Sequence, residues 1–459
     1  MFDGFKSFWK GVYKKMFPQQ TIKNVIQRDI CLSDTMARRI ELWSAMYKGM
    51  GPWCDDYVKS LRKEQGICRE FANICLNEME SEVSNEKLNE LYKSAIKNLN
   101  ENLQSGLALG SFCIKPLGEG NVEYITADRF IPVEFDARDR LIDVVFIQVK
   151  RIGDNNYYYR LERHSLKNQV LTITNRAFHS TNETDLGSEV SLDSVDEWAK
   201  LPPSISYQGL ERPDFGYYRN PIKNEVDGSA CGVSVFDSAI DQLRNADIQG
   251  ARLDWEFESG ERAVHVDIMA LQSTAKVNAK GNTEMVTPRL NKRLFKGLNL
   301  QQGSDTELYK EWSPTFREDN ILNGMNEYLR QIEFNVSLSY GDISNPQNVE
   351  KTATECIVAK KRKYNMVTAI QENLKECLED LVYALAFYNA MTRTGYEFVC
   401  SFKDSILVDE ETERVQDRQD VSMGVMSLVE YRMKWYNETE EQAMKMIPQQ
   451  ADVDTGGDE

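Results

Sequence analysis

The chain has 459 residues, of which 41% are hydrophobic and 28% are charged, so it can bury a large core and is too apolar for an intrinsically disordered protein. Its 72 acidic and 55 basic residues give a net charge of -17, which argues against a protein that grips nucleic acid with its whole surface. Any contact with DNA is therefore expected to be local. The length suggests two to four structural units, or one elongated and interrupted domain.

The first 17 residues have an amphipathic pattern, with Phe5, Phe8, Trp9, Val12 and Met16 on one helical face and lysines off it. The segment lacks the continuous apolar core of a signal peptide. No stretch of the chain approaches the roughly 18 to 20 apolar residues of a membrane span. Such a helix could lie on a membrane surface or dock onto a neighbouring subunit, and in an acidic chain with no other membrane feature we favour docking.

Residues 33–105 show helical spacing of apolar residues, interrupted at Gly49–Pro52. Residues 106–180 change to an alternating pattern rich in β-branched and aromatic residues, with turns of Gly, Asp and Asn between the runs. This pattern predicts an antiparallel meander. The proline-containing stretch 181–230 is predicted to be mostly loop and to close the first unit.

At Ser234 the pattern becomes helical again, because Ser234 and Asp237 form a capping-box-like start to a long helix that ends at Gly260. Residues 261–318 alternate and turn, which predicts a small, β-rich α/β insertion. A second helix then begins at Asp319 or Asn320. It ends in a polar loop that starts at Gly341.

An apolar stripe over residues 353–393 predicts a helix that approaches about 60 Å at ~1.5 Å per residue. One or two strands are expected after Gly395. Two capping boxes, Ser427 to Glu430 and Thr439 to Gln442, predict two short helices. The polar segment at the end of the sequence is predicted to be disordered.

The cysteines and histidines offer little chemistry. The nine cysteines form no C-x-x-C pair, which predicts reduced and mostly buried thiols of a cytoplasmic protein. The three histidines, His164, His179 and His265, are far apart in the sequence, so a His-rich metal site is not expected. No phosphate-binding loop, dinucleotide fingerprint, serine-hydrolase elbow or H-E-x-x-H motif occurs. We therefore expect no catalytic residues, no cofactor and no metal.

Two basic clusters stand out from the acidic background. Residues 261–300 contain seven basic and three acidic residues, and Lys360 to Lys363 form an uninterrupted basic run. Each cluster can be interpreted in two ways. It could be structural, as a solvated helix face or a row of salt bridges between subunits. It could instead make a local contact with a phosphate backbone or an acidic partner.

The order of these elements resembles that of tailed-bacteriophage portal proteins. The strings GLALGSFCIKPL, ITADRFIPVEFD, CGVSVFDSAIDQLRNADIQ, WEFESGERAV, KTATE and GVMSLVEYRMKWYNETEEQA are similar to the portal branch of phages that infect Gram-positive bacteria. The resemblance extends over nearly the whole chain and includes no catalytic signature. Cys231 and Cys356 depart from the aliphatic residues expected there, but a buried cysteine is a small hydrophobe.

The resemblance implies an α+β, portal-like fold assembled as a closed ring, typically a dodecamer, at one capsid vertex. It implies seven regions: 1–232 as the wing, 233–260 and 319–340 as stem helices, 261–318 as the clip, 341–352 as the tunnel loop, 353–408 as the long wing helix with returning strands, and 409–459 as the crown with a disordered tail.

The implied function is a DNA channel for packaging by the terminase, for DNA retention and ejection, and for attachment of the head-tail adaptor and tail. The chain would not be an enzyme. Its implied partners are other copies of itself, the terminase large subunit, the head-completion adaptor, the major capsid and scaffolding proteins, and double-stranded DNA, with no membrane. It would reside at the portal vertex of the virion, and in the host cytoplasm during assembly.

Three groups of site residues follow from these expectations. Polar residues that could touch moving DNA weakly are Asn345, Gln347, Asn348 and Lys351. Cationic residues that could dock the terminase or adaptor are Arg289, Lys292, Arg293 and Lys296. Apolar residues expected to support ring assembly are Leu243, Leu253, Tyr328 and Leu329. Most of the charge at 360–363 is expected to pair with acidic residues of a neighbouring subunit.

Two alternative functions remain open. One is a nuclease-type subunit of a packaging complex, which would need a cluster of acidic residues around a metal. The acidic pairs Asp55–Asp56 and Glu379–Asp380 are interpreted as solvated surface instead. The other alternative is a minor structural protein of the head or tail without a DNA channel.

Overall fold

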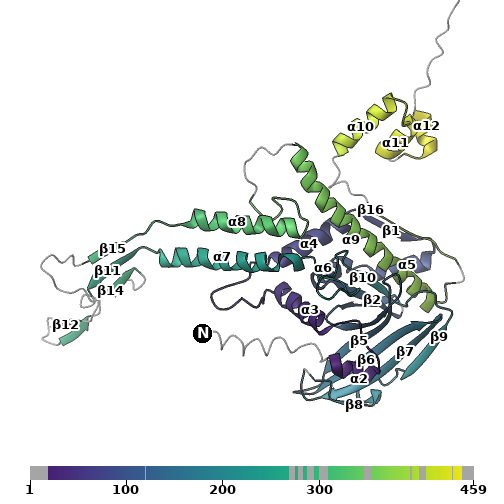
Figure 1. The fold of residues 1–459 in the computed structure, drawn as a ribbon, viewed down its shortest axis with the longest axis horizontal. Helices are drawn as coiled ribbons and strands as arrows, with labels where there is room; N and C mark the ends of the chain where they lie inside the picture. The colour runs from purple at the N-terminus through teal and green to yellow at the C-terminus, as the bar shows by residue number, and fades with distance from the viewer. Residues whose placement is uncertain are drawn as a thin grey trace, which may run out of the picture.

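The computed structural model describes residues 19–118, 120–183, 185–267, 274–277, 283–286, 294–298, 309–345, 353–392, 395–402, 410–436 and 438–446. They form a mixed α+β structure with three parts: a body, an arm of two helices that projects from it, and a small group of helices near the C-terminus (Figure 1). The predicted amphipathic segment 1–17 lies outside the described residues.

The predicted helical region is confirmed, and it also contains one strand. Ser33 caps one of its helices by accepting a hydrogen bond from the backbone N–H of Met36 at 3.1 Å. The strand was missed because its partner lies more than 300 residues away along the chain, pairing Met79 with Phe402. The elements are α2 (Gln19–Ile26), α3 (Asp34–Tyr47), α4 (Lys63–Leu76), β1 (Met79–Val83), α5 (Glu86–Ala95) and α6 (Leu99–Leu109).

The predicted meander is also confirmed, but it divides between two sheets. One sheet has the order β10-β2-β3, and the other has the order β4-β5-β6-β7-β8, with β9 also paired to β7. The segment predicted to be loop therefore supplies three strands. The elements are β2 (Ser111–Gly118), β3 (Asn121–Thr126), β4 (Phe130–Phe135), β5 (Leu141–Arg151), β6 (Tyr157–Lys167), β7 (Val170–Ser180), β8 (Ser188–Val190), η1 (Leu192–Ser194), β9 (Ser204–Gln208) and β10 (Gly216–Arg219).

The predicted long helix, α9 (Ala353–Tyr388), has 36 residues and ends before the expected residue 393. Leu374, Leu378 and Leu381 on it are fully buried in the main core of the body. The helix lies against β10, where a Cβ on Gly216 would approach the carbonyl oxygen of Cys377 to 2.4 Å. Glycine at this position therefore permits close packing of the helix on the sheet.

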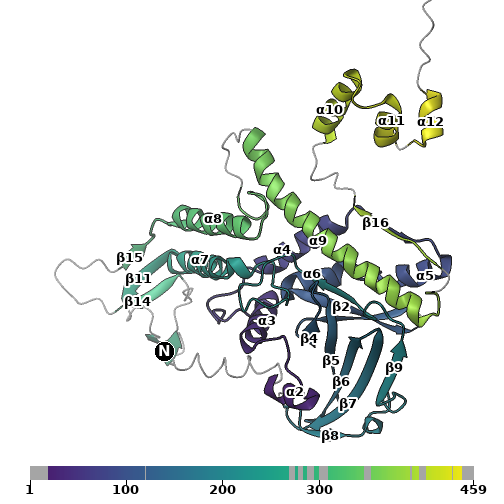
Figure 2. The ribbon, with the colours of Figure 1, turned by 45° about the vertical axis from the view of Figure 1, so that its right-hand side comes forward.

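The arm consists of α7 (Ile240–Ser259) and α8 (Glu318–Asn335), which lie side by side in both ribbon views (Figures 1 and 2). A short 3-10 turn, η2 (Asp237–Ala239), precedes α7, so the helix begins six residues after the predicted cap at Ser234. The carboxylate of Asp237 instead accepts hydrogen bonds from Arg39 and Trp43 of α3, at 2.6 and 2.8 Å. Packing against the body thus replaces the predicted capping box.

Strands lie beyond the arm helices. The central strand β11 runs parallel to β14 and antiparallel to β15, and β12 pairs with β13 as a separate hairpin. The described residues between 261 and 317 contain no helix, so the predicted α/β insertion is entirely β there. The strands are β11 (Ala263–Asp267), β12 (Thr274–Val277), β13 (Thr283–Val286), β14 (Phe295–Leu298) and β15 (Tyr309–Trp312).

The C-terminal elements are β16 (Phe398–Phe402), α10 (Glu410–Ser422), α11 (Leu428–Tyr436) and α12 (Glu440–Met446). The first predicted capping box is confirmed by both of its reciprocal hydrogen bonds, and the second by one of its two. The N–H of Ser427 donates to Glu430, the N–H of Glu430 donates to Ser427, and the N–H of Thr439 donates to Gln442. The helix α10 was not predicted.

Candidate functional site

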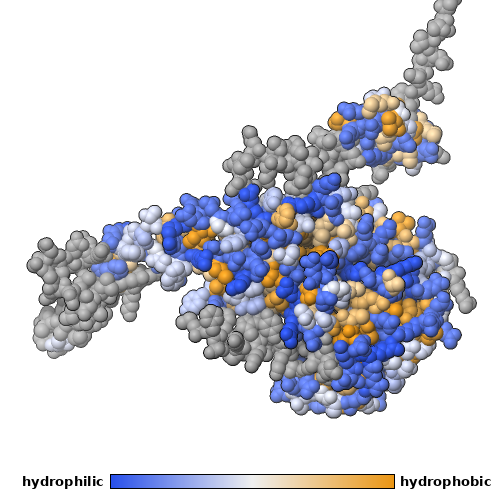
Figure 3. Space-filling view, viewed as in Figure 1, coloured by the Kyte–Doolittle hydropathy of each residue, from blue (hydrophilic) through white to orange (hydrophobic). Residues whose placement is uncertain are grey.

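The arm buries few side chains, and those it buries lie mostly near the body. No residue of α8 before Leu329 is buried, and in α7 the buried residues stop at Asp247 until Glu256 near the far end. Figure 3 shows apolar patches interspersed with polar surface along this arm. The large apolar residues that it exposes are Trp255 (62% exposed), Phe257 (47%), Leu322 (41%) and Phe334 (57%).

The residues predicted to support ring assembly occupy two different environments. Leu243 and Leu329 are only 2% and 7% exposed and belong to the main core of their own chain. Leu253 and Tyr328 are half-buried. A substitution at Leu243 or Leu329 therefore tests folding of the single chain before it tests assembly. The exposed Trp255, which sequence reasoning missed, could have been found as an aromatic residue off the apolar stripe.

A buried carboxylate, that of Glu256, links the two helices at the far end of the arm. Glu256 of α7 accepts hydrogen bonds from the backbone N–H of Arg317 at 2.9 Å and from its guanidinium at 2.7 Å. These hydrogen bonds lower the pKa of Glu256, so the carboxylate is ionised. The contact joins the end of α7 to the start of α8, where the strands leave the helix pair.

A second carboxylate, Asp247, holds the base of α7 to the body. It accepts hydrogen bonds from the indole N–H of Trp53 at 2.8 Å and from the backbone N–H of Leu61 at 2.7 Å. Burial raises the pKa of Asp247, and the two hydrogen bonds oppose that rise. The loop between α3 and α4 is thereby fixed to the arm.

A third carboxylate organises the segment that leaves α8. Glu333 is fully buried, and one of its oxygens accepts three backbone N–H groups, from Gly341, Ile343 and Ser344, at 3.0, 2.7 and 2.8 Å. Its other oxygen accepts the hydroxyl of Ser344 at 2.8 Å. Gly341 has a φ of +101°, which glycine adopts readily. The chain therefore wraps around Glu333 before it reaches residue 346.

Part of the basic run at 360–363 makes contacts within the chain itself. Lys363 is buried, and its ammonium lies 3.0 Å from Glu70 of α4 and 3.0 Å from Asp342. The guanidinium of Arg362 lies over the rings of Phe334 and Tyr340, at 4.6 and 5.2 Å. The expectation that most of this charge pairs with a neighbouring subunit is thus corrected for Lys363. Lys360 and Lys361 are exposed.

Two of the predicted channel and docking residues, Asn345 and Lys296, lie in the described part of the chain. Asn345 is exposed, and its backbone N–H donates to the side-chain oxygen of Asn326 at 2.7 Å. Lys296 lies in β14, where it is paired with His265 of β11. The remaining predicted residues lie outside the described part of the chain; these are Gln347, Asn348, Lys351, Arg289, Lys292 and Arg293.

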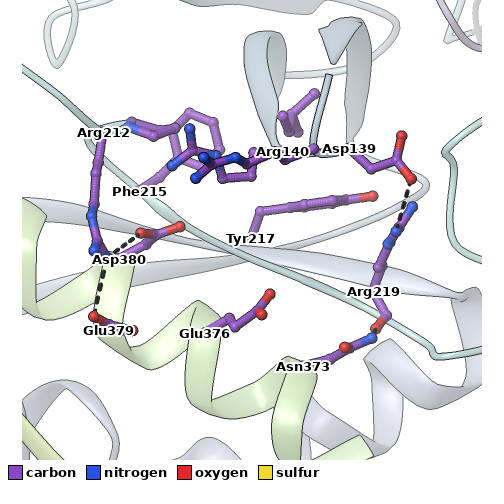
Figure 4. Close-up of a pocket in the computed structure, with 13 residues that line it drawn as sticks. Asp139, Arg140, Arg212, Phe215, Tyr217, Arg219, Asn373, Glu376, Glu379 and Asp380 are labelled. Carbon is purple, nitrogen blue, oxygen red and sulfur yellow. Dashed lines mark hydrogen bonds and ion pairs between the residues drawn. The ribbon is translucent and has the colours of Figure 1, made fainter. Parts of the chain in front are cut away.

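The body contains a charged pocket of about 290 Å³ between α9, β10 and the turn after β4 (Figure 4). On α9, Glu379 and Asp380 both pair with Arg212, at 3.3 and 3.2 Å, and across the pocket Arg219 pairs with Asp139 at 3.2 Å. Burial raises the pKa of Asp380 to about 6, although Arg212 opposes the shift. Glu379 is exposed, as predicted, whereas Asp380 is half-buried, and Arg212 pairs with both.

A buried charge network ties the larger sheet to the end of α9. The ring nitrogens of His164 lie 2.7 Å from Asp214 and 3.0 Å from Glu162. Lys115 also pairs with Glu162 at 2.6 Å, and the hydroxyl of Tyr388 donates to Asp214 at 2.6 Å. Burial alone would lower the pKa of His164, but the two carboxylates raise it to about 9. Because a carboxylate occupies each ring nitrogen, the network is structural, and sequence reasoning missed it.

Three further observations concern the described residues as a whole. These residues include no group of three or more His, Cys, Asp or Glu side chains placed to hold a metal ion. Of the nine cysteines, the side chains of all but Cys356 are described; none of these eight forms a disulfide, and six are buried, as predicted. None of the helices in this part of the chain is long and apolar enough to cross a membrane.

Comparisons of the chain with models of known protein families and with curated protein sequences find no match.

Proposed function

We propose that this chain is the subunit of a ring-shaped portal through which double-stranded DNA enters and leaves a phage capsid. The observation that carries the proposal is the arm, in which two long helices project from a well-packed body, carry strands at their far end and leave large apolar side chains uncovered. This arrangement fits the order of elements in the portal proteins that the sequence resembles.

The build of the arm supports the proposed ring. Two helices packed only on each other can cover one stripe on each, so residues such as Trp255 and Leu322 need another surface. The described residues of the body leave these side chains exposed, so the proposal assigns the surface that covers them to another copy of the chain. A closed ring supplies that surface because every copy presents one arm to each of its two neighbours.

The channel is proposed to be lined near the segment that follows α8. Contacts with Glu333 and Lys363 hold the start of that segment in place. Asn345, which follows directly, is the first of the predicted DNA-contact residues and offers a side-chain amide. Amides bind phosphate weakly and release it, and a net charge of -17 limits adhesion of DNA elsewhere. Cysteine placement at Asn345 or Gln347, followed by crosslinking to DNA in filled heads, tests this part.

The strands beyond the arm are proposed to dock the terminase during packaging and the head-completion adaptor afterwards, with the capsid and scaffolding proteins contacting the body. The basic residues from Arg289 to Lys296 would speed and orient the docking of acidic partners. Charge reversal at Arg293 and Lys296 should abolish packaging and leave rings intact. Normal packaging by that variant would remove this assignment.

The proposal as a whole is tested by the mass of the purified protein, combined with a nuclease assay on double-stranded DNA with added divalent metal. A portal should give a large closed oligomer without nuclease activity. A monomer or dimer that cleaves DNA would favour a DNA-processing subunit, and a small assembly without activity would favour a minor head or tail protein.

A further inference from the structure

The joint between the arm and the body contains two buried carboxylates. Both ribbon views place α4 beside the end of α7 that meets the body (Figures 1 and 2). Glu64, in the first turn of α4, is 2% exposed, and Asp247, in α7, is 3% exposed. We call these two residues, together with the loop between α3 and α4 (residues 48–62), the arm joint.

Asp247 is the residue through which α7 holds the loop of the arm joint. Its two oxygens accept the indole N–H of Trp53 and the backbone N–H of Leu61. The side chain of Leu61 also packs on α7 beside Gly250, where a Cβ would come within 3.2 Å of it. The loop therefore meets the arm over a small area, and both of its hydrogen bonds to α7 described above end on this one carboxylate.

Glu64, by contrast, is surrounded by other acidic groups. The charge of Asp247 acts on it from α7, and the thiols of Cys54 in the loop and Cys68 on α4 both feel the charge of Glu64. Within the described part of the chain, no lysine, arginine or histidine forms an ion pair with Glu64. An ionised Glu64 would therefore be a buried charge without a counter-charge.

The nearest basic residues of the loop make contacts elsewhere. The ammonium of Lys59 donates to the backbone carbonyl of Asp55 at 2.9 Å. The guanidinium of Arg62 lies against Gly49, where a Cβ would be 3.1 Å from its central carbon. Neither cation is placed to neutralise the two carboxylates of the arm joint.

This environment favours a protonated Glu64. Burial raises its pKa to about 7; its own backbone N–H at the start of α4 opposes the rise, and the charge of Asp247 adds to it. In the unfolded chain the same group would ionise near pH 4.5. The folded joint thus holds a proton on Glu64 below neutral pH and carries two buried negative charges above it.

We propose that the arm joint is a proton-dependent latch, in which the loop stays bound to α7 while Glu64 is protonated and separates from α7 when that proton is lost to solvent. Two charges at buried positions repel each other, and exposing Glu64 to water relieves both the repulsion and the cost of burial. The contacts that give way are those that Trp53 and Leu61 make with Asp247. The base of the arm would then be freed from the body. This inference concerns a single chain and does not depend on the proposed ring.

Hydrogen exchange of the full-length protein at pH 5 and pH 7 tests the latch, after correction for the intrinsic exchange rate at each pH. The amide of Leu61 reports the joint directly, because its N–H is bound to Asp247. Opening that exposes Glu64 returns its pKa from about 7 toward 4.5, so the opening constant should rise by on the order of tenfold or more between the two pH values. Amides of β7 should show no such rise.

Two matched variants decide whether Glu64 is responsible. Glu64→Gln keeps the size of the side chain and resembles its protonated form, so opening at Leu61 should become independent of pH. Glu90→Gln makes the same change at an exposed position on α5 and should keep the pH dependence of the natural chain. Equal opening of the natural chain at pH 5 and pH 7 would overturn the inference. So would a pH dependence that persists in Glu64→Gln.

Discussion

The body and the arm are both built from amphipathic helices, yet they bury them very differently. In the body, α4 and α9 place residues such as Phe71 and Leu378 in a core with no measurable exposure. In the arm, the part of α8 before Leu329 buries nothing, and Trp255 remains 62% exposed. The body thus has a large core of its own, whereas the arm buries few residues beyond its base.

The arm is nevertheless held firmly at its ends. Asp247 fixes its base, Glu256 closes its far end and Glu333 organises the segment that leaves it. Each of these carboxylates is buried and accepts at least one backbone N–H, so their hydrogen bonds set the direction of the helices without using the helix faces. The helix faces between them bury few residues.

The largest expected effect on folding is in the body. Phe71→Ala should lower the free energy of unfolding by about 3 to 5 kcal/mol, because it removes a fully buried aromatic ring and leaves a cavity. Trp255→Ala in the arm should change it by less than about 0.5 kcal/mol in the monomer. Urea denaturation of both variants measures the difference. Equal losses of unfolding free energy in the two variants would show that the body and the arm do not differ in how much these side chains are buried.

Glu333→Gln should cost about 2 to 3 kcal/mol, since a neutral amide oxygen is a weaker acceptor for the backbone N–H groups of Gly341, Ile343 and Ser344, and the amide nitrogen cannot accept the Ser344 hydroxyl. Hydrogen exchange at these three amides should accelerate. Glu327→Gln, at an exposed position on the same helix, serves as the control and should leave them protected. Unchanged protection in Glu333→Gln would mean that the carboxylate does not organise this segment.

His164 predicts a pH dependence that belongs to the body alone. Its pKa is raised to about 9 in the folded chain, against about 6.5 when unfolded, so its contribution is complete below pH 6.5 and is lost as the pH rises to about 9. The loss should approach about 3 kcal/mol. Unfolding measured between pH 6 and 10 should show this fall in the natural chain and not in His164→Gln. A parallel fall in both would assign the pH dependence to other groups.

The smallest effect on folding, with the largest effect on assembly, is expected for Trp255→Asp. An exposed indole contributes little to the monomer, but an aspartate in its place would be buried without a partner between subunits. Size-exclusion chromatography should show smaller species. Val149→Asp, at a 50% exposed position on β5 of the body, should leave the assembly intact. Rings that survive Trp255→Asp would place the subunit contact elsewhere.

Local patterns in the sequence predicted much of the fold. The meander, the long helix and both capping boxes depend on neighbours within a few residues, such as Ser427 and Glu430, and could be read directly. The strand β1 could not, because it pairs with β16 across more than 300 residues. Asp237 does not take part in the predicted capping box, because its carboxylate accepts hydrogen bonds from Arg39 and Trp43 instead. The sequence could not predict these bonds, because they form only when α3 packs beside Asp237.

The candidate site was harder to predict for a related reason. Leu243 and Leu329 have the apolar spacing of a helix face, but spacing does not distinguish a face that meets the body from one that meets another subunit. The role of Glu333 depends on three backbone groups that gather only when the chain turns at Gly341. The same holds for Lys363, whose partners come from α4 and from the segment after α8.

Negative-stain class averages of the purified, full-length protein, viewed along the symmetry axis, test the central claim most directly. The account predicts a closed ring with a central opening, formed by copies whose arms contact one another. Single particles of about one 52.8 kDa chain, or compact dimers without an opening, at a concentration where the chain is fully folded would contradict it.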